Sequence, residues 1–404
     1  IYTGTILEHL LIEQLAAFYE TGEHNIYRLR GADWNDALDM ASERGESTAF
    51  TCAYAGNLRE LASMIRLLED ITDQKEISLI EELKVLLNDD TELFENTERK
   101  KELLSQYTKS CCHTISGRRF TIPLSQLADN LEQKAVWLTG FLRRNEWING
   151  CGEEGWFNSY YDNSGRAVEG IFPDGIRMML TGQVFAIMGN VASREQISRI
   201  VQSADHYLYR REIGGYRLKT DFHELKFDMG RMFGFAYGEK ENGAVFSHMT
   251  VMYANALYKR GFAKEGWKAL KTLADTALNF DTSRIYPGIP EYFRSDGRGM
   301  YHYLTGAASW FMLTMITQVF GVRGDAGDLI FDPKLTEEQF DENGNASLFI
   351  TFADKKFNIT YKNANHKDYG DYVIGSAVCG NTYLKLKKNG SAILLREDIL
   401  TFGD

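Results

Sequence analysis

The stretch RLRGADWNDALD, residues 28–39, lies between two amphipathic helical patterns, and the rest of the chain is organised around it. With its continuation RGES at residues 44–47, it predicts a connection of roughly twenty-five residues, and compact domains rarely carry so long a loop without a functional reason. Trp34 could pack on the face of a pyranose ring. A carboxyl group held against this indole in a partly dry pocket would have a raised pKa, as a general acid requires. A solvated acidic loop that caps the next helix is the alternative.

Helical spacing of apolar residues dominates the first 320 residues. The pattern predicts helices over residues 5–19, 58–68, 126–147, 175–189, 193–209, 247–259, 263–278 and 305–320, with a solvated helix pair over 78–110. Successive helices joined alternately by short turns and long loops suggest an α/α toroid. The expected fold class is therefore mainly α, with a toroid or barrel portion over residues 1–324.

The character of the sequence changes after about Gly324. Phe357, Ile359 and Tyr361 alternate with polar residues, as in a half-buried strand. Asn389-Gly390 lies between two apolar runs and is a strong hairpin signal. Residues 325–404 are therefore expected to form a small antiparallel β domain that packs against the helical domain and carries no catalytic constellation.

The composition excludes several classes of partner. A net charge of −11 makes a nucleic-acid or anionic-membrane partner unfavourable, and no apolar run has the length of a membrane span. The five cysteines show no metal-ligand spacing, so we expect reduced thiols in a cytoplasmic protein without a signal peptide. The chain begins with Ile1, from which we expect a fragment of a longer polypeptide. A homodimer is left open.

The string GADWND, followed by RGES, resembles the catalytic loop of the inverting disaccharide and oligosaccharide phosphorylases of glycoside hydrolase family ninety-four, such as cellobiose phosphorylase. Later motifs match in the same order as far as Trp310. The resemblance implies an (α/α)₆ barrel with a C-terminal β domain. It makes Asp36 the general acid and places Trp34, Asn35 and Asp33 at the sugar site, although capping or supporting roles suit Asp33 and Asp39 better.

Two later motifs could make an anion site. The string KENGAVFSH, residues 240–248, resembles a family segment in which Lys240 and Glu241 would contact sugar and His248 phosphate. Ser247 is expected to cap the next helix and so place His248 at its positive end. In the string GRGMYHYLTGAASW, residues 297–310, the resemblance assigns Thr305 and Gly306 to phosphate. Arg298 and Arg44 are further phosphate candidates, and ordinary helix caps or surface ion pairs are the alternatives.

Two departures from the family pattern stand out. Some members place a phosphate-contacting Gln before the Gly-Arg-Gly segment. Here the corresponding string is EYFRS at residues 291–295, so Arg294 or Ser295 would substitute. The family's remaining sugar-site residues and its N-terminal β-sandwich lie upstream of the catalytic loop, so this chain is expected to be a C-terminal portion.

The resemblance therefore predicts inverting phosphorolysis of a β-glucoside, with inorganic phosphate as co-substrate and with no metal or organic cofactor. The products are α-glucose 1-phosphate and a shortened acceptor. The motifs look closest to the branch that acts on β-1,2-gluco-oligosaccharides. One alternative is an inverting hydrolase with Asp36 as acid and Glu241 as base. Another is a non-catalytic carbohydrate-binding fragment.

Overall fold

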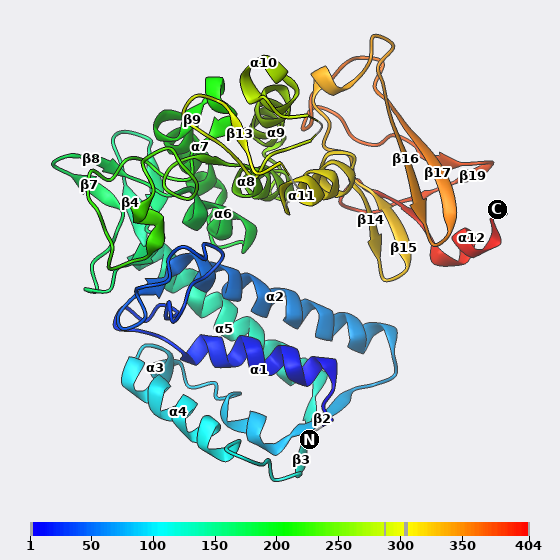
Figure 1. Cartoon of the computed structure of the whole chain (residues 1–404). Coiled ribbons are helices and arrows are strands. Elements are labelled where there is room, and N and C mark those ends of the chain that lie inside the picture. The colour runs from blue at the N-terminus through cyan, green and yellow to red at the C-terminus, as the bar shows by residue number, and fades with distance from the viewer. Residues whose placement is uncertain (1–2, 287, 303–305, 403–404) are drawn as a thin grey trace. The chain divides into compact units, whose positions relative to one another are not determined.

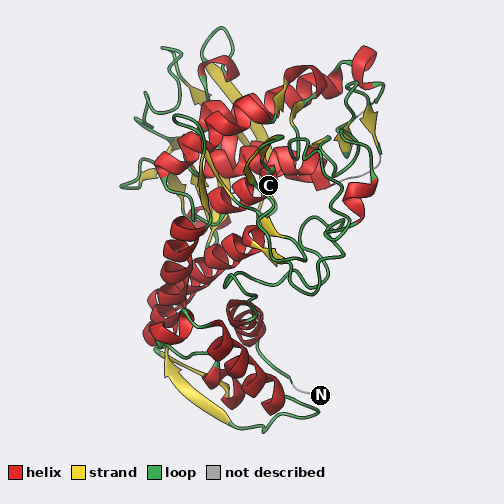
Figure 2. Ribbon diagram, turned by 90° about the vertical axis from the view of Figure 1, so that its left-hand side faces the viewer, coloured by secondary structure: helices red, strands yellow, loops and turns green. Residues whose placement is uncertain are grey.

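The computed structural model describes residues 3–286, 288–302 and 306–402, which form two compact units. Unit 1 comprises Ile1–Tyr209 and Tyr216–Ala244, and unit 2 comprises Arg210–Gly215 and Val245–Asp404. The described residues are mainly helical, with small antiparallel sheets (Figures 1 and 2). The strands β9 (Tyr209–Arg210) and β10 (Gly215–Tyr216) each include residues of both units.

Unit 1 is built on long helices, and α2 packs along α5, α1 and α6 (Figure 1). Its helices are α1 (Ile6–Tyr19), α2 (Thr48–Ile71), α3 (Thr91–Phe94), α4 (Thr97–Ser110), α5 (Leu124–Asn145), α6 (Leu180–Met188) and α7 (Arg194–Tyr207). Two of these helices begin with capping boxes that can be read from the sequence, at Thr5 with Glu8 and at Ser193 with Gln196. The core between α2 and α5 is formed by buried leucines such as Leu58 and Leu131.

The strands of unit 1 are short, and each pairs with one antiparallel neighbour. They are β1 (Glu46–Ser47), β2 (Glu76–Ile80), β3 (Arg119–Pro123), β4 (Trp147–Asn149), β5 (Gly155–Phe157), β6 (Tyr160–Tyr161), β7 (Gly170–Phe172) and β8 (Gly175–Arg177). The prediction of a solvated helix pair over 78–110 was wrong in part, because residues 76–80 form β2, which pairs with β3. Strands of two to five residues are too short to show a two-residue period.

Unit 2 begins with three neighbouring helices, in which α8 packs against α9 and α11. Its helices are α8 (Ser247–Lys259), α9 (Ala263–Leu278), α10 (Phe280–Ser283), α11 (Gly306–Thr314) and α12 (Arg396–Thr401). The bounds of α8 and α9 confirm the predicted helices over 247–259 and 263–278. The predicted helix over 305–320 is α11, and a π-helical turn over Met315–Val319 follows it.

The C-terminal part of unit 2 contains the longest hairpin, β16–β17, and a four-stranded sheet in the order β14-β15-β21-β20. The strands of unit 2 are β11 (Val245–Phe246), β12 (Tyr292–Phe293), β13 (Gly299–Met300), β14 (Val322–Asp325), β15 (Asp328–Phe331), β16 (Asn345–Phe352), β17 (Lys355–Lys362), β18 (Val378–Cys379), β19 (Thr382–Tyr383), β20 (Lys385–Leu386) and β21 (Ala392–Leu394). The predicted Asn389-Gly390 turn joins β20 to β21, and Gly390 has φ +87°. A separate cluster that includes Val322, Phe357 and Leu394 forms the core here.

Candidate functional site

The acidic loop between α1 and α2 is held from within by the buried side chain of Glu46. Its carboxylate accepts hydrogen bonds from the backbone N–H of His24 (3.1 Å) and of Ile26 (3.2 Å), and it lies 2.6 Å from Nδ1 of His24. The His24 ring stacks on Tyr161 with centroids 3.7 Å apart. Burial raises the pKa of Glu46. These contacts therefore hold the loop in one conformation, although it contains little regular structure.

Asp33 uses both carboxylate oxygens inside the loop. Oδ1 accepts from the backbone N–H of Asn35 at 2.8 Å, and Oδ2 accepts from the Ser47 hydroxyl at 2.8 Å. Burial raises the pKa of Asp33 to about 6, against the effect of these donors. The sequence assigned Asp33 to the sugar site. In the structure its oxygens are engaged by the protein, which favours the capping alternative.

Asp36 is exposed on the same loop. Its side chain is 76% exposed, and its Oδ2 lies 3.1 Å from Nη2 of Arg231. The partly dry pocket expected for the general acid is thus not found at Asp36. Asp33 is the carboxyl group in the desolvated position, because its side chain turns inward toward the start of α2 while that of Asp36 turns toward solvent.

Arg231 is a functional candidate that the sequence analysis missed. Its Nη1 lies 2.7 Å from Oδ2 of Asp39, and its backbone N–H donates to Oδ1 of Asp39 at 3.0 Å. These bonds lower the pKa of Asp39. Arg231 therefore bridges Asp36 and Asp39, although it follows them by nearly 200 positions in the sequence. A single arginine without a motif carries no signal that could have located it.

The two residues between Asp33 and Asp36 differ in their surroundings. Asn35 is buried, its Oδ1 accepts from the backbone N–H of Ala37 at 3.2 Å, and its Nδ2 lies 3.4 Å from Sδ of Met232. Asn35 therefore shapes the turn that presents Asp36. Trp34 is partly buried, so part of its indole is accessible to a ligand.

Lys240 and Glu241 form a tight turn in unit 1. Lys240 has φ +45°, and its Nζ lies 5.1 Å from the centre of the Phe235 ring. The backbone N–H of Gly238 donates to the carbonyl oxygen of Asn242 at 2.7 Å and closes the turn. Burial raises the pKa of Glu241, and the charge of Asp36 acts in the same direction. The structure thus brings Glu241 into the electrostatic neighbourhood of Asp36.

Arg44 does not lie in an open anion site. Its Nε and Nη2 contact the two carboxylate oxygens of Glu23 at 2.9 and 2.6 Å. This pair raises the pKa of Arg44. Because a bidentate carboxylate already occupies the guanidinium, the surface ion pair named as the alternative describes Arg44 better than a phosphate ligand does.

The other predicted phosphate residues lie in unit 2. His248 is the second residue of α8, and burial lowers its pKa. Ser247 was expected to cap this helix. Instead Ser247 is the first helical residue, and Phe246 occupies the N-cap position without a side-chain cap. A Cβ added to Gly306 would lie 3.0 Å from Cε1 of His248, so the start of α11 directly faces the imidazole.

The structure gives less support to the other residues that the sequence assigned to phosphate. Thr305 lies outside the described residues. Arg298 is exposed at the turn between β12 and β13, where its backbone N–H donates to Oδ1 of Asp296 at 3.1 Å. Arg294 of the same turn pairs with Asp296 at 3.5 Å. The structure therefore brings His248 and Gly306 together and leaves Arg298 as a surface residue.

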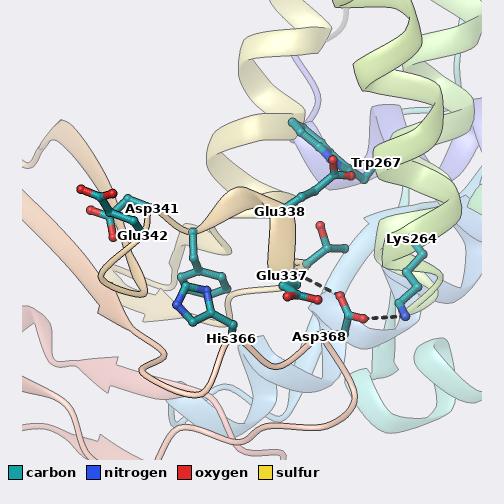
Figure 3. A pocket seen from close by; sticks show the side chains of 10 residues that line it. Lys264, Trp267, Glu337, Glu338, Asp341, Glu342, His366 and Asp368 are labelled. Atoms are coloured by element: carbon teal, nitrogen blue, oxygen red, sulfur yellow. Dashed lines mark hydrogen bonds and ion pairs between the residues drawn. The ribbon is translucent and has the colours of Figure 1, made fainter.

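Unit 2 also contains a cavity of about 530 Å³ that includes none of the predicted site residues (Figure 3). Its wall carries Trp267, several carboxylates and the ion pair between Lys264 and Asp368, whose Nζ and Oδ2 are 2.6 Å apart. Asp368 also accepts from the backbone N–H of Glu337 at 2.9 Å. The charged groups of Lys264 and Asp368 are therefore already engaged in contacts within the protein.

Residues 3–286, 288–302 and 306–402 contain no cluster of His, Cys, Asp and Glu with the geometry of a metal site. Within the same ranges, no helix combines the length and apolar character needed to cross a membrane. The five cysteines are free thiols.

Comparisons with known proteins confirm the resemblance drawn from the motifs. Residues 126–321 match the family described as "Glycosyl hydrolase 94 superfamily, catalytic domain". The 3-O-β-D-glucopyranosyl-β-D-glucuronide phosphorylase of Paenibacillus borealis is 24% identical over 345 residues, which cover 82% of this chain and 36% of that protein. The cellobionic acid phosphorylase of Neurospora crassa is 26% identical over 208 residues, or 48% of this chain and 25% of that protein.

A further relative is named for the formation of a glucan. The cyclic β-(1,2)-glucan synthase NdvB of Rhizobium meliloti is 22% identical over 351 residues, which cover 83% of this chain and 10% of that protein. The chain thus spans about a third or less of the length of these three relatives.

Proposed function

We propose that this chain, whose residues 126–321 match the catalytic domain of the glycosyl hydrolase 94 superfamily, is part of an inverting phosphorylase of β-glucosides. The observation that carries the proposal is the family match, together with relatives that are named as phosphorylases of glucosylated saccharides. The acidic loop exposes the carboxyl group of Asp36 to solvent, and a carboxyl group can serve as the general acid of this reaction.

In the proposed reaction, Asp36 donates its proton to the glycosidic oxygen as the bond from that oxygen to the anomeric carbon breaks. An oxygen of inorganic phosphate forms a bond to the same carbon from the opposite face. The products are an α-sugar 1-phosphate and an acceptor with one sugar fewer. Phosphate is already an anionic nucleophile, so the reaction needs no second carboxylate to activate water, unlike inverting hydrolysis.

The ion pair with Arg231 sets a requirement on this step. A general acid must carry a proton, whereas a guanidinium neighbour favours the ionised carboxylate. We therefore propose that Asp36 gives up its contact with Arg231 when the acceptor sugar binds, while Asp39 keeps the other guanidinium nitrogen. Trp34, Lys240 and Glu241 are assigned to the sugar, with the Trp34 ring against a pyranose face.

Phosphate is assigned to His248, Thr305 and Gly306. The positive end of a helix dipole attracts anions. Because Gly306 has no side chain, the imidazole of His248 can lie close to the backbone at the start of α11. We also propose the finer architecture, an (α/α)₆ toroid followed by a C-terminal β domain from residue 325.

The substrate that we propose first is a β-1,2-gluco-oligosaccharide, from the form of the motifs and from the relative named for β-(1,2)-glucan. Arg231 favours a second candidate, an acceptor with a carboxylate group. A guanidinium binds a carboxylate through two parallel hydrogen bonds, and two relatives are named for a glucuronide and for cellobionic acid. If the second candidate is correct, replacing Arg231 with Met should lower turnover of an acidic disaccharide far more than that of a neutral one, beyond any common loss from the freed Asp36 and Asp39.

The deciding experiment measures release of glucose 1-phosphate from a panel of neutral and acidic β-glucosides, with and without inorganic phosphate. It uses the complete polypeptide that carries this chain. We expect phosphate-dependent product and a loss of at least a hundredfold in Asp36→Asn, because general acid catalysis contributes about 10²–10⁴ in rate. Asp73→Asn makes the same chemical change at an exposed position away from the loop and should leave the rate unchanged.

Two results would contradict the proposal. Release of free sugar without phosphate would favour the inverting hydrolase, in which Glu241 serves as base. Sugar binding that survives Asp36→Asn, with no turnover by either protein, would favour a non-catalytic carbohydrate-binding role.

A further inference from the structure

The Asp33 carboxylate lies where the two ends of the acidic loop meet. At one end it accepts from the backbone N–H of Asn35, within the Trp34-Asn35-Asp36 segment. At the other end it accepts from the hydroxyl of Ser47, which ends the loop. The Tyr160 hydroxyl interacts with the same carboxyl group. One side chain therefore ties the segment that carries the proposed acid to the far end of its loop.

Ser47 extends this connection into the helical framework. Its Oγ also accepts from the backbone N–H of Phe50 at 3.0 Å and so caps α2. Glu46, immediately before it, is the buried carboxylate that holds His24 and Ile26. A continuous chain of hydrogen bonds thus runs from Asn35 through Asp33 and Ser47 to the first turn of α2. The negative charge of Asp33 near this helix N-terminus is favourable.

The buried position of Asp33 costs stability when the carboxyl group is ionised. Burial raises its pKa to about 6 from an ordinary value of 3.8, so the folded protein binds this proton more tightly than the unfolded chain does. Above pH 6 the group is ionised in both states, and its desolvation then destabilises the fold. A residue kept only for stability would not need this charge at neutral pH.

We infer that Asp33 is a positioning residue, whose carboxylate holds Trp34, Asn35 and Asp36 in place through Ser47 and the start of α2 and makes no contact with sugar. This inference rests on the proposed function only for the role of Asp36. Of the two roles that the sequence left open for Asp33, it drops sugar binding and makes the supporting role specific.

Asparagine at position 33 tests the inference with nearly the same shape. Its one carbonyl oxygen could still accept from Asn35, and its NH₂ group would then donate to the Ser47 hydroxyl oxygen, which also accepts from the backbone N–H of Phe50. The charge-assisted bond from Ser47 to the carboxylate is replaced by a neutral and weaker one, so the bridge is loosened, and the charge of Asp33 is removed. We expect Asp33→Asn to unfold thermally at the same or a higher temperature at pH 8, while the loop becomes more mobile.

The measurement is amide hydrogen exchange of peptides covering residues 31–40, with turnover and thermal unfolding recorded on the same samples. In Asp33→Asn we expect exchange of this segment to rise at least tenfold and kcat to fall at least tenfold, with KM for phosphate unchanged. Asp73→Asn should behave as the wild type. In the background of Ser47→Ala, Asp33→Asn should change loop exchange much less, because both substitutions act on the same connection.

Three outcomes would overturn the inference. Loss of turnover with unchanged loop exchange would make Asp33 a substrate ligand. A thermal midpoint that falls in parallel with activity would make its role purely structural. Additive effects with Ser47→Ala would show that Asp33 does not act through Ser47. Failure of the proposed reaction would appear separately, in the phosphate dependence and in Asp36→Asn, because hydrogen exchange does not depend on turnover.

Discussion

Gly230 and Arg231 fix the direction of the carboxylates in the acidic loop. The backbone N–H of Met232 donates to the carbonyl oxygen of Ala37 at 3.2 Å, so the two segments touch along their backbones. A Cβ at Gly230 would lie 2.0 Å from that same oxygen and 2.7 Å from the backbone nitrogen of Asp39. Only glycine allows the two backbones to come this close, and their close contact places Arg231 beside Asp36 and Asp39.

Replacing Gly230 with Ala should therefore push the acidic loop away from the segment that carries Arg231. We expect a loss of about 1–3 kcal/mol in unfolding free energy, as for overpacked interior sites, together with a large loss of activity. Denaturation in urea and the phosphorolysis assay would measure the two effects. Gly234→Ala is the matched control, because a Cβ there meets no atom within 4 Å. Equal behaviour of the two variants would contradict this account of the contact.

At the scale of elements, α2 supports the loop because it packs closely on two other helices. Its contact with α6 depends on small residues. A Cβ on Gly189, which ends α6, would lie 2.2 Å from the carbonyl oxygen of Cys52, and one on Gly56 would lie 2.7 Å from Cα of Gly189. The backbones of the two helices therefore approach too closely for any side chain at the crossing.

Gly189→Ala should separate α2 from α6 and destabilise unit 1 by about 1–3 kcal/mol. Gly140→Ala, within α5, should instead be neutral or stabilise by up to about 1 kcal/mol, since alanine favours helix over glycine. At position 140 the nearest atom is the end of the flexible Arg144 side chain, 3.2 Å from the added Cβ. Urea midpoints of the two variants would distinguish these directions. A more stable Gly189→Ala protein would refute the close crossing.

At the scale of the whole molecule, unit 1 contains three buried lysines whose pKa values are lowered to about 7 by desolvation. Lys100 lies 4.4 Å from the Phe18 ring centre and donates to Oδ1 of Asn25 at 2.8 Å. Lys134 donates to the carbonyl oxygen of Asn88. Lys219 lies over Phe222 at 4.3 Å. Aromatic faces and neutral oxygens replace the water that these ammonium groups lose on folding.

These lysines make unfolding depend on pH. Their ordinary pKa is 10.5, so above pH 7 the unfolded chain holds protons that the folded protein has released. Stability must then rise with pH between about 7 and 10.5. We expect a higher urea midpoint at pH 9.5 than at pH 8, a window above the titration of Asp33 (about 6). Glu169, whose pKa is raised to about 8, titrates at the lower edge of this window with the opposite sign, but it is one group against three lysines.

Substituting all three lysines with Met should remove most of this rise. Substituting the exposed Lys109 with Met should retain it. A wild-type midpoint that stays constant or falls over this window would contradict the assignment of buried, neutralised lysines.

The sequence by itself determined the features that depend on neighbours along the chain. The helical period located α8 and α9, Asn389-Gly390 located the β20–β21 turn, and the motifs named the family that residues 126–321 match. Such features are encoded within a few residues, because caps, turns and amphipathic faces are local. The same local signals placed a tryptophan and three carboxylates in one loop, but they did not distinguish the carboxylates.

Only the tertiary structure decided how those carboxylates differ. Asp33 turns inward to Ser47, whereas Asp36 turns outward to Arg231, which follows it by nearly 200 residues. The structure likewise paired Arg44 with Glu23 and placed Gly306 against His248. Charge, burial and pKa depend on which groups lie within a few ångströms, and the folded chain brings those groups from distant positions. The loop sequence therefore specified the chemical groups, and the packing around it assigned their environments.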